Sequence, residues 1–355
     1  MKVLFTHELF SPYIVGGGEI YCELLVRGLL KKGIDVTVVA GSWEKSKFEI
    51  WEGIPIHRVN LFPSRYLFNI KNLIKLKEVS KKIKPDLIHA NTYHSAMPAS
   101  IIGKIHKKPV VLSTHSFFLT DWFQCFNPIY AAAFYTFERL MYKFPFDNII
   151  CLDWGIYDKL CALGMEDKLS LVPHPVDVSK FKPNRKKNDK ITIGSVSRFY
   201  DVTKKLDSFF EAIEKFSGRK NVDFLAVGPY TKKQEEFFRK NNIKFTGKVP
   251  YSEIPKYLNE IDIFIGQGMA AKEAMSTGCA TVLNKAIPRF TGYHRTEIKE
   301  GAMLSGNTLD IVEDLLNNPE KINKLSKKSV NFIRENYSLE KIVERVIEVY
   351  EKILN

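Results

Sequence analysis

Residues 261–283, IDIFIGQGMAAKEAMSTGCATVL, contain in one run the pieces from which the fold is built. Residues 261–265 form an apolar, β-branched run of strand length, and Gly-Gln-Gly at 266–268 interrupts it before the good helix formers at 269–276. Gly278 closes that helix, and residues 280–283 have the composition of another strand. The stretch therefore predicts a strand, a glycine turn, a helix and a second strand, which is the repeating unit of an α/β fold.

The glycine turn also predicts chemistry. Free N–H groups at a helix start, with the positive end of the helix dipole behind them, form an anion site. Because glycine has no side chain, a phosphate can approach the backbone closely there. Glu273, on the first turn or two, can accept hydrogen bonds from a ribose hydroxyl pair. Gly266, Gly268 and Ala271 fit the dinucleotide fingerprint G-x-G-x-x-A, but the acidic residue expected about 20 positions later is missing. A turn that only packs a helix onto a sheet is the structural alternative.

Length and composition set the broad class. A chain of 355 residues suits two α/β domains of about 150 to 200 residues each, and 45% hydrophobic with 26% charged residues is ordinary for a globular protein. Five scattered cysteines without a C-x-x-C pair or a Cys/His cluster favour a reducing compartment and no structural metal. Met1 leads directly into a strand pattern, and no apolar run reaches the ~18 residues of a spanning helix. We therefore expect a cytoplasmic protein.

The net charge of +13, supplied largely by lysine, favours anionic partners. Nucleic acid, an acidic membrane surface and phosphorylated small molecules all fit this charge. A solvated lysine-rich surface, as in many thermophile proteins, explains it equally well.

The first half opens with a β-α-β pattern, namely strands at 3–6 and 36–40 around a helix at 19–32. The loop before that helix holds Gly16, Gly17 and Gly18, whose cost in chain entropy suggests that something approaches this backbone closely; a flexible connector is the alternative. A lysine-rich helix at 73–83 and further strands at 87–90, 110–113, 148–152 and 169–173 follow. His115 lies at a strand's carboxyl end, where open α/β sheets bind ligands, although a lone histidine more often satisfies a neighbouring backbone group.

Residues 116–146 are rich in aromatic side chains and also carry Arg139 and Lys143. Helix packing in the core explains most such aromatic stripes. Alternatively, some of these aromatic side chains lie on the surface, where they would bind lipid or enter a membrane interface together with nearby lysines.

A polar segment at 181–190 predicts a linker, after which the strand-helix alternation restarts with strands at 191–196, 223–227 and 244–245 and helices at 206–216, 232–240 and 251–259. Residues 338–354 predict a closing amphipathic helix. Arg198 follows the 191–196 strand, with Lys204 and Lys205 beside a helix start. A guanidinium and an ammonium placed in this way can converge on a phosphate and stabilise a departing diphosphate without a metal ion.

At this point almost the whole chain resembles the family-four retaining nucleotide-sugar glycosyltransferases. Gly16-Gly17-Gly18-Glu19 is similar to the family's G-G-x-E, and residues 85–91, PDLIHAN, to its P-D-v-i-H-x-H strand, with Asn91 in place of the second histidine. Residues 172–177 with 181–183 resemble v-I-P-N-G-V-D…F-x-P, with His174-Pro175 replacing Asn-Gly. The most specific match is residues 245–264, which keep both the order and the spacing of f-x-G-x-v…l-p-x-y-l…a-D-v-f.

The resemblance implies a GT-B fold, in which two Rossmann-like α/β domains face each other across a cleft. It implies an acceptor-side domain at 1–180, a nucleotide-sugar-binding domain at 190–336, and a terminal segment at 337–355 that returns to the first domain. No cofactor and no metal are expected, since the UDP- or GDP-sugar donor is a substrate. The implied activity is retaining transfer of a sugar to a glycan or lipid-linked hydroxyl acceptor, through an oxocarbenium-like state.

Roles carry over from the family residue by residue. Arg198 and Lys204 would hold the donor diphosphate, and Lys205 competes with Lys204 because the family spacing is one shorter. Gly16 and Gly17 would approach the phosphates, and His115 would lie beside the donor sugar near the reacting carbon. Glu273 matches the second glutamate of E-x7-E, which holds the ribose. The remaining donor-binding positions are backbone ones: Gly268, Met269 and Ala270.

One departure concerns the first glutamate of E-x7-E, which falls on Ile265. That carboxylate contacts donor-sugar hydroxyls in the family, so the resemblance does not define the sugar here. A family subset has a shortened G-x-G-x-x-x-x-E-A-M loop similar to this one, and the resemblance to it implies an active enzyme. A GT-B nucleotide-sugar epimerase, a non-catalytic nucleotide-sugar binding subunit and a dinucleotide oxidoreductase remain alternatives. Nucleic acid is not expected, because no RNA-binding pattern appears.

The aromatics of 117–146 and the lysines of 73–84 lead us to expect a lipid-linked acceptor and peripheral contact with the anionic inner face of a membrane.

Overall fold

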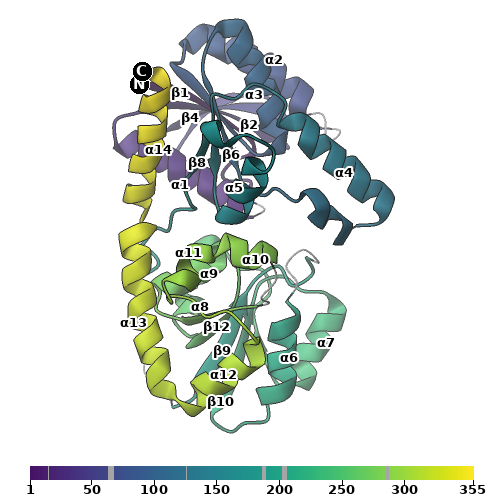
Figure 1. The fold of residues 1–355 in the computed structure, drawn as a ribbon, viewed down its shortest axis with the longest axis vertical. Helices are drawn as coiled ribbons and strands as arrows, with labels where there is room; N and C mark the ends of the chain where they lie inside the picture. Colours follow the sequence, from purple (N-terminus) through teal and green to yellow (C-terminus); the bar gives the residue numbers. More distant parts are fainter. Residues whose placement is uncertain (15, 63–67, 125, 186–188, 202–205, 285–287) are drawn as a thin grey trace. The chain divides into compact units, whose positions relative to one another are not determined.

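A computed structural model describes residues 1–14, 16–62, 68–124, 126–185, 189–201, 206–284 and 288–355 (Figure 1). These residues form two compact units. Met1–Pro175 together with Leu339–Asn355 make the first unit, and Val176–Ser338 make the second. Each unit is a Rossmann-like arrangement of helices around a largely parallel sheet, as the alternation of strand and helix patterns predicted.

The sheet of the first unit contains, within the described residues, eight strands in the order β3-β4-β2-β1-β5-β6-β7-β8. Every pair is parallel except β3 with β4. The strands are β1 Lys2–Leu9, β2 Asp35–Ser42, β3 Phe48–Trp51, β4 Ile54–Asn60, β5 Leu87–Asn91, β6 Val110–Thr114, β7 Asn148–Cys151 and β8 Leu169–Leu171. The chain moves outward from β1 in one direction and resumes at β5 on its other side, so the strand order reverses between β1 and β5.

Helices cover this sheet: α1 Gly17–Lys31, α2 Phe68–Ile83, α3 Tyr93–His106, α4 Pro128–Met141, α5 Trp154–Cys161 and the closing helix α14 Leu339–Leu354. Short 3-10 turns lie at η2 Leu119–Gln124 and η3 Glu166–Lys168. Helix α14 packs against α1 at Gly28, where a Cβ would lie 2.3 Å from Cγ2 of Val343. A glycine in α1 therefore permits the close approach of the last helix.

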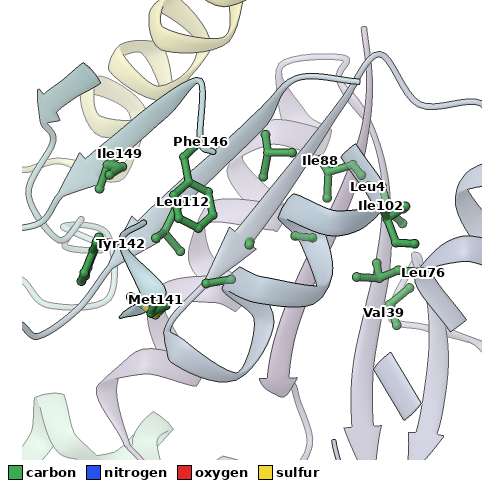
Figure 2. Close-up of a cluster of buried hydrophobic side chains, with 14 of the residues drawn as sticks. Leu4, Val39, Leu76, Ile88, Ile102, Leu112, Met141, Tyr142, Phe146 and Ile149 are labelled. Atoms are coloured by element: carbon green, nitrogen blue, oxygen red, sulfur yellow. The ribbon is translucent and has the colours of Figure 1, made fainter. Parts of the chain in front are cut away.

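A buried apolar cluster fills the space between this sheet and its helices (Figure 2). Leu4, Ile88 and Leu112 come from three neighbouring strands, and Leu76 and Ile102 come from α2 and α3. Nearly every residue of β1 is buried, instead of every second one. Helices therefore cover both faces of the sheet at this strand.

The aromatic segment divides between core and surface. Phe117, Phe118, Tyr142 and Phe146 are buried, as core packing predicts. Helix α4 buries only a narrow stripe made by Ala131, Glu138 and Met141, and most of its other side chains are exposed. The interpretation that core packing explains most of this stripe is therefore wrong for α4, whose exposed aromatic residues include Tyr130 and Phe137.

The second unit has, in its described part, a five-stranded parallel sheet in the order β11-β10-β9-β12-β13. The strands are β9 Ile191–Val196, β10 Val222–Val227, β11 Lys244–Phe245, β12 Ile263–Gly266 and β13 Ala280–Leu283. The helices are α6 Asp207–Phe216, α7 Lys232–Lys240, η5 Tyr251–Glu253, α8 Ile254–Leu258, α9 Met269–Ser276, α10 Pro288–Tyr293, α11 Arg295–Lys299, α12 Thr308–Asn317 and α13 Pro319–Asn336. The strand order reverses between β9 and β12.

The segment after Pro175 packs as part of the second unit rather than as an extended connector. The Phe181 ring is buried against Tyr251, with ring centroids 5.5 Å apart, and Ser276 Oγ donates a hydrogen bond to the Phe181 carbonyl. Arg185 pairs with Asp262 at 3.1 Å. The start of the segment expected to be a linker is thus anchored to the β12–α9 region.

Candidate functional site

The carboxyl edge of β9 and β12 is the point in the second unit where the strand order reverses. Ligands of open α/β sheets bind at such topological switch points, because the loops leaving the two central strands diverge there. Arg198 lies two residues beyond the end of β9, and Gly268 lies two residues beyond the end of β12. Since β9 and β12 are parallel neighbours, the sheet topology brings these two predicted donor-binding positions to the same edge.

The glycine turn leads into α9 without a side-chain cap. Gly268 has a φ of 72°, which disfavours other residues, and a Cβ added there would meet nothing within 4 Å. Gly266 is tightly enclosed instead, since its Cβ would lie 2.5 Å from the ring of Phe264. Met269 and Ala270 occupy the first turn of α9, where N–H groups have no partner within the helix. The turn therefore presents backbone donors beside open space, as an anion site requires.

Glu273 lies one turn into α9 and is only 4% exposed. Its Oε1 accepts a hydrogen bond of 2.6 Å from the Tyr251 hydroxyl. Burial raises the pKa of Glu273 to about 8 from an ordinary 4.5, and the Tyr251 hydrogen bond only partly offsets the rise. A carboxyl group in this setting can receive hydroxyl donors, and a ligand that donates to it would favour its ionised form.

The cationic part of the predicted site is only partly described. Arg198 forms an ion pair of 2.9 Å with Asp201 in the turn after β9, and its side chain is 35% exposed. The guanidinium therefore keeps donor capacity toward solvent while Asp201 orients it. Lys204 and Lys205 lie outside the described residues.

Ile265 is fully buried in β12 and belongs to the apolar core of the second unit. A carboxylate at this position would lie in the core rather than beside a sugar. An apolar residue replaces the first glutamate of E-x7-E because this position packs in the core around β12.

Sequence reasoning missed a buried polar network behind the glycine turn. The Gly268 N–H donates to Nε2 of His294 at 2.9 Å, and Nδ1 of His294 lies 3.3 Å from Oε1 of Glu297. Nζ of Lys272 lies 3.4 Å from the same Glu297 oxygen, with both side chains 1% exposed. The signals were a lysine inside the otherwise apolar face of α9 and the His294-x-x-Glu297 spacing, but nothing in the sequence joins them.

The charges in this network are set by one another. Burial alone would raise the pKa of Glu297, but Lys272 and the His294 hydrogen bond outweigh it and hold this pKa at about 2. Burial lowers the pKa of His294, which the Glu297 hydrogen bond opposes only in part. The network therefore contains an ammonium, a carboxylate and a neutral imidazole at neutral pH.

In the first unit the glycine loop also sits at the strand-order reversal, between β1 and α1. The Glu19 carboxylate accepts the Gly16 N–H at 2.7 Å, which explains the acidic residue three positions into the motif. Gly17 is the first residue of α1. The start of α1 lies close to two histidines, since a Cβ on Gly18 would lie 3.6 Å from Nε2 of His7 and 3.9 Å from Nδ1 of His115.

His115 belongs to a cluster of rings that the sequence did not predict. Its ring centroid lies 4.7 Å from that of Tyr21, 5.3 Å from that of His174 and 6.3 Å from that of His7. Burial lowers the pKa of His115 well below its ordinary value, with smaller contributions from the neighbouring histidines. Within the described residues, neither ring nitrogen of His115 has a hydrogen-bond partner. His115 is thus a buried, neutral imidazole whose two nitrogens are unsatisfied among the described residues.

Asn91 marks the other strand at this reversal point. It ends β5, is fully buried, and both of its side-chain amide atoms lack a hydrogen-bond partner among the described residues. Thr92 follows with a φ of 61°, an unfavourable value for a β-branched residue. Strained backbone and unsatisfied polar atoms of this kind concentrate at functional sites.

Two further properties concern metals and membranes. Across the described ranges, no group of three or more His, Cys, Asp or Glu side chains is placed to hold a metal ion. None of the helices in the described part of the chain has both the length and the hydropathy needed to cross a bilayer.

Two family models match the chain, one for each half. Glycosyltransferase Family 4 matches residues 15–180, and Glycosyl transferases group 1 matches residues 190–316. The two matches adjoin around the segment near residues 180–190 and together account for most of the sequence.

Curated relatives carry the same kind of name. The chain is 23% identical over 201 residues to the glycosyltransferase MJ1607 of Methanocaldococcus jannaschii, a match that covers 54% of this chain and 50% of that protein. It is 23% identical over 330 residues to TuaC of Bacillus subtilis, named as a teichuronic acid biosynthesis glycosyltransferase, covering 81% of this chain and 78% of TuaC. The aligned part thus spans half the length of the first relative and about three quarters of the second.

Solved structures show the same fold along nearly the whole chain. Sucrose-phosphate synthase from Thermosynechococcus elongatus has a TM-score of 0.80 at 17% identity, covering 99% of this chain and 98% of that one. Anabaena HepE, solved in complex with UDP-glucose, has a TM-score of 0.76 at 15% identity, covering 99% of this chain and 100% of that one. With both family models matched and the two Rossmann-like domains of the GT-B fold present, the chain belongs to the family-four, group 1 glycosyltransferases.

Proposed function

We propose that this protein is a retaining glycosyltransferase that moves a sugar from a UDP- or GDP-sugar to a hydroxyl acceptor. The observation that carries the proposal is the β9–β12 switch point, which holds Arg198 on one side and the glycine turn of α9, with Glu273 behind it, on the other. The anion donors of the turn suit a diphosphate, and the buried carboxyl suits the adjacent ribose.

The proposed chemistry follows from where charge develops. The bond between the anomeric carbon and the diphosphate breaks through an oxocarbenium-like state, and negative charge accumulates on the leaving diphosphate. Arg198 and the N–H groups of Met269 and Ala270 stabilise that charge, together with Lys204 or Lys205. The acceptor hydroxyl then attacks the anomeric carbon from the face that the leaving group vacates and gives its proton to an oxygen of the departing diphosphate, so the configuration is retained. The roles expected for Gly16, Gly17 and His115 remain predictions.

Binding and turnover test this function separately. Calorimetric titration with UDP, GDP and NAD should show binding of one nucleoside diphosphate and none of NAD; NAD binding alone would favour an oxidoreductase. A panel of radiolabelled nucleotide sugars with membrane extract should then label an acceptor. A donor that changes configuration without any acceptor would identify an epimerase, and binding without turnover would identify a non-catalytic subunit.

The relatives' names suggest which donor and acceptor to test first. HepE was solved with UDP and with UDP-glucose, and TuaC is named for the biosynthesis of teichuronic acid. We therefore propose a UDP-sugar as the first donor and a lipid-linked glycan as the first acceptor. Because Ile265 is a core residue of β12 and offers no carboxylate to a sugar, the sugar itself is to be found from the panel.

A specific surface supports the proposed membrane contact. Tyr130, Ala133, Phe137 and Leu140 recur at helical spacing along one face of α4, and this face is exposed, with Tyr130 at 61% and Leu140 at 52%. Together with Ile129, which is 82% exposed, these residues form what we call the α4 surface. Arg139 lies on the exposed part of the same helix, and the chain carries a net charge of +13, so an anionic bilayer is the proposed occupant.

Vesicle sedimentation tests this contact. We expect binding to vesicles with anionic lipid at low salt, weaker binding at high salt, and loss of binding when Ile129, Phe137 and Leu140 are replaced by serine. The matched control replaces Phe48 and Ile50, exposed apolar residues on the edge strand β3, and should bind normally. No binding at low salt would remove the idea, and a dimer dissolved by the triple change would assign the α4 surface to a second copy of the chain.

A further inference from the structure

The N–H of Gly268 is not available to a ligand, although it belongs to the glycine turn. It donates to Nε2 of His294 at 2.9 Å, and His294 is fully buried. An imidazole nitrogen that accepts a hydrogen bond carries no proton, so the ring proton of neutral His294 resides on Nδ1. This nitrogen lies 3.3 Å from Oε1 of Glu297, the partner that such a proton needs.

Glu297 is in turn held by an ammonium. Nζ of Lys272 lies 3.4 Å from Oε1 of Glu297, and it also lies 4.9 Å from the ring centroid of Tyr293 and 4.5 Å from that of Tyr337. A buried lysine between two aromatic faces and a carboxylate is a fixed charge, because each partner would be left uncompensated without the other. The network is therefore rigid at the end remote from the turn.

The network contacts the glycine turn through the peptide group between Gln267 and Gly268. The N–H and C=O of a trans peptide point in opposite directions, so anchoring the Gly268 N–H on His294 also orients the Gln267 carbonyl. Gly268 has a φ of 72°, a Cβ added there would meet nothing within 4 Å, and no side-chain cap bonds the start of α9. The hydrogen bond to His294 is therefore a direct restraint on this peptide.

We propose that His294, held by Glu297 and Lys272, is a positioning residue for the donor diphosphate: it fixes the Gln267–Gly268 peptide so that the anion meets the N–H groups of Met269 and Ala270. The inference rests on the proposed function, whose donor it concerns. It requires a hydrogen-bond acceptor at position 294 and excludes the Gly268 N–H from the donors that bind the anion.

Substitution at position 294 tests the proposal. His294→Leu removes the acceptor, while His294→Gln offers a carbonyl oxygen in a similar place. We expect His294→Leu to weaken UDP binding at least tenfold, or GDP binding if the wild type prefers guanine, and His294→Gln to recover most of this loss. Binding of the parent nucleoside, which has no phosphate, should change less than twofold, because its ribose meets Glu273 rather than the turn.

A matched control separates positioning from general loss of stability. Ser329 is also fully buried in the second unit and donates to the Ala302 carbonyl at 2.6 Å, so Ser329→Ala removes a buried hydrogen bond that does not involve the turn. It should leave nucleotide binding unchanged. If His294→Leu binds the nucleoside diphosphate as tightly as the wild type, or loses nucleoside and diphosphate equally, the proposal is overturned.

A spectroscopic measurement on the unaltered protein makes the test independent of whether a variant folds. In protein labelled with nitrogen-15 at histidine, His294 should be a neutral ring with its proton on Nδ1, and Gly268 should show slow amide exchange without any ligand. A proton on Nε2 would refute the inference even if nucleotide binds. Absence of any nucleotide binding by the wild type would instead refute the proposed function.

Discussion

Replacing Glu273 by glutamine should change how the stability of the second unit depends on pH. Glu273 is 4% exposed and has the Tyr251 hydroxyl as its hydrogen-bond donor, while neighbouring Lys272 is paired with Glu297. The folded state therefore holds this carboxyl group with a pKa of about 8, against an ordinary value of 4.5. Ionisation in the folded state is disfavoured because the buried carboxylate lacks compensation.

The magnitude follows from linkage. The gap between pKa values of 4.5 and about 8 corresponds to about 5 kcal/mol, because each pKa unit is worth about 1.4 kcal/mol. A raised folded-state pKa means that the contribution of Glu273 to stability is fully present below about pH 4.5 and is lost as the pH rises through about 8. Glutamine cannot ionise, so the Gln variant does not lose this stability. Its free energy of unfolding should therefore rise relative to that of the wild type as the pH increases from about 4.5 to about 8.

The assay must report on the second unit by itself. All four tryptophans, Trp43, Trp51, Trp122 and Trp154, lie in the first unit, so tryptophan fluorescence would miss the effect. Urea-dependent hydrogen exchange of peptides from α9 and β9, measured for both proteins from pH 5 to 9, gives the difference in unfolding free energy. A difference that stays flat within about 1 kcal/mol over this range would refute the reasoning.

Donor binding supplies a second readout of the same carboxyl group. If the ribose hydroxyls donate to ionised Glu273, binding lowers its pKa and the complex releases a proton at neutral pH. Calorimetry of the wild type in two buffers of different ionisation enthalpy should detect a release that approaches one proton. The Gln variant should release none through this group, and equal release by both proteins would exclude Glu273 from the ribose site.

Three other changes test separate features. Gly228→Ala should destabilise the second unit by about 3 kcal/mol or more in urea unfolding followed by circular dichroism, because its Cβ would lie 2.0 Å from the Ser197 carbonyl oxygen at a φ of 129°. Tyr350→Phe should lower the stability of the first unit by about 1 to 2 kcal/mol in tryptophan fluorescence, since it removes the buried hydrogen bond to His89; no change would mean that this bond contributes nothing. Arg198→Ala should abolish transfer in the radiolabelled assay with an unaltered melting temperature, and near-normal rates would overturn its assignment to the diphosphate.

The local pieces of the fold could be predicted because they depend on short-range patterns. The opening stretch predicted a strand, a turn, a helix and a strand, and β12, α9 and β13 confirm it. Strands β3 and β4 and helices α3, α5, α10, α11, α12 and α13 were missed. Helix α3 has a proline and a glycine in its interior, Pro98 and Gly103, which weaken its helical pattern, and Gly103 is there because Val110 packs against it.

The exposure of α4 shows where a sequence pattern stops being informative. Its aromatic residues resemble a core stripe, yet the helix buries only the narrow face that includes Glu138. The Glu138 carboxylate accepts hydrogen bonds from the backbone N–H groups of Phe118 and Leu119, so a polar anchor attaches the helix together with the buried Ala131 and Met141. Composition does not reveal which face of a helix meets the protein.

The sequence by itself determined that this chain consists of two α/β halves and that glycine turns, Arg198, His115 and Glu273 follow strands or begin helices. These properties depend on residues close together in the chain. Only the tertiary structure decided that β9 and β12 are neighbours, that His7, His115 and His174 share one cluster, and that His294 takes the Gly268 N–H. Strand order and buried polar contacts join segments tens of residues apart, and no local period encodes which segments meet.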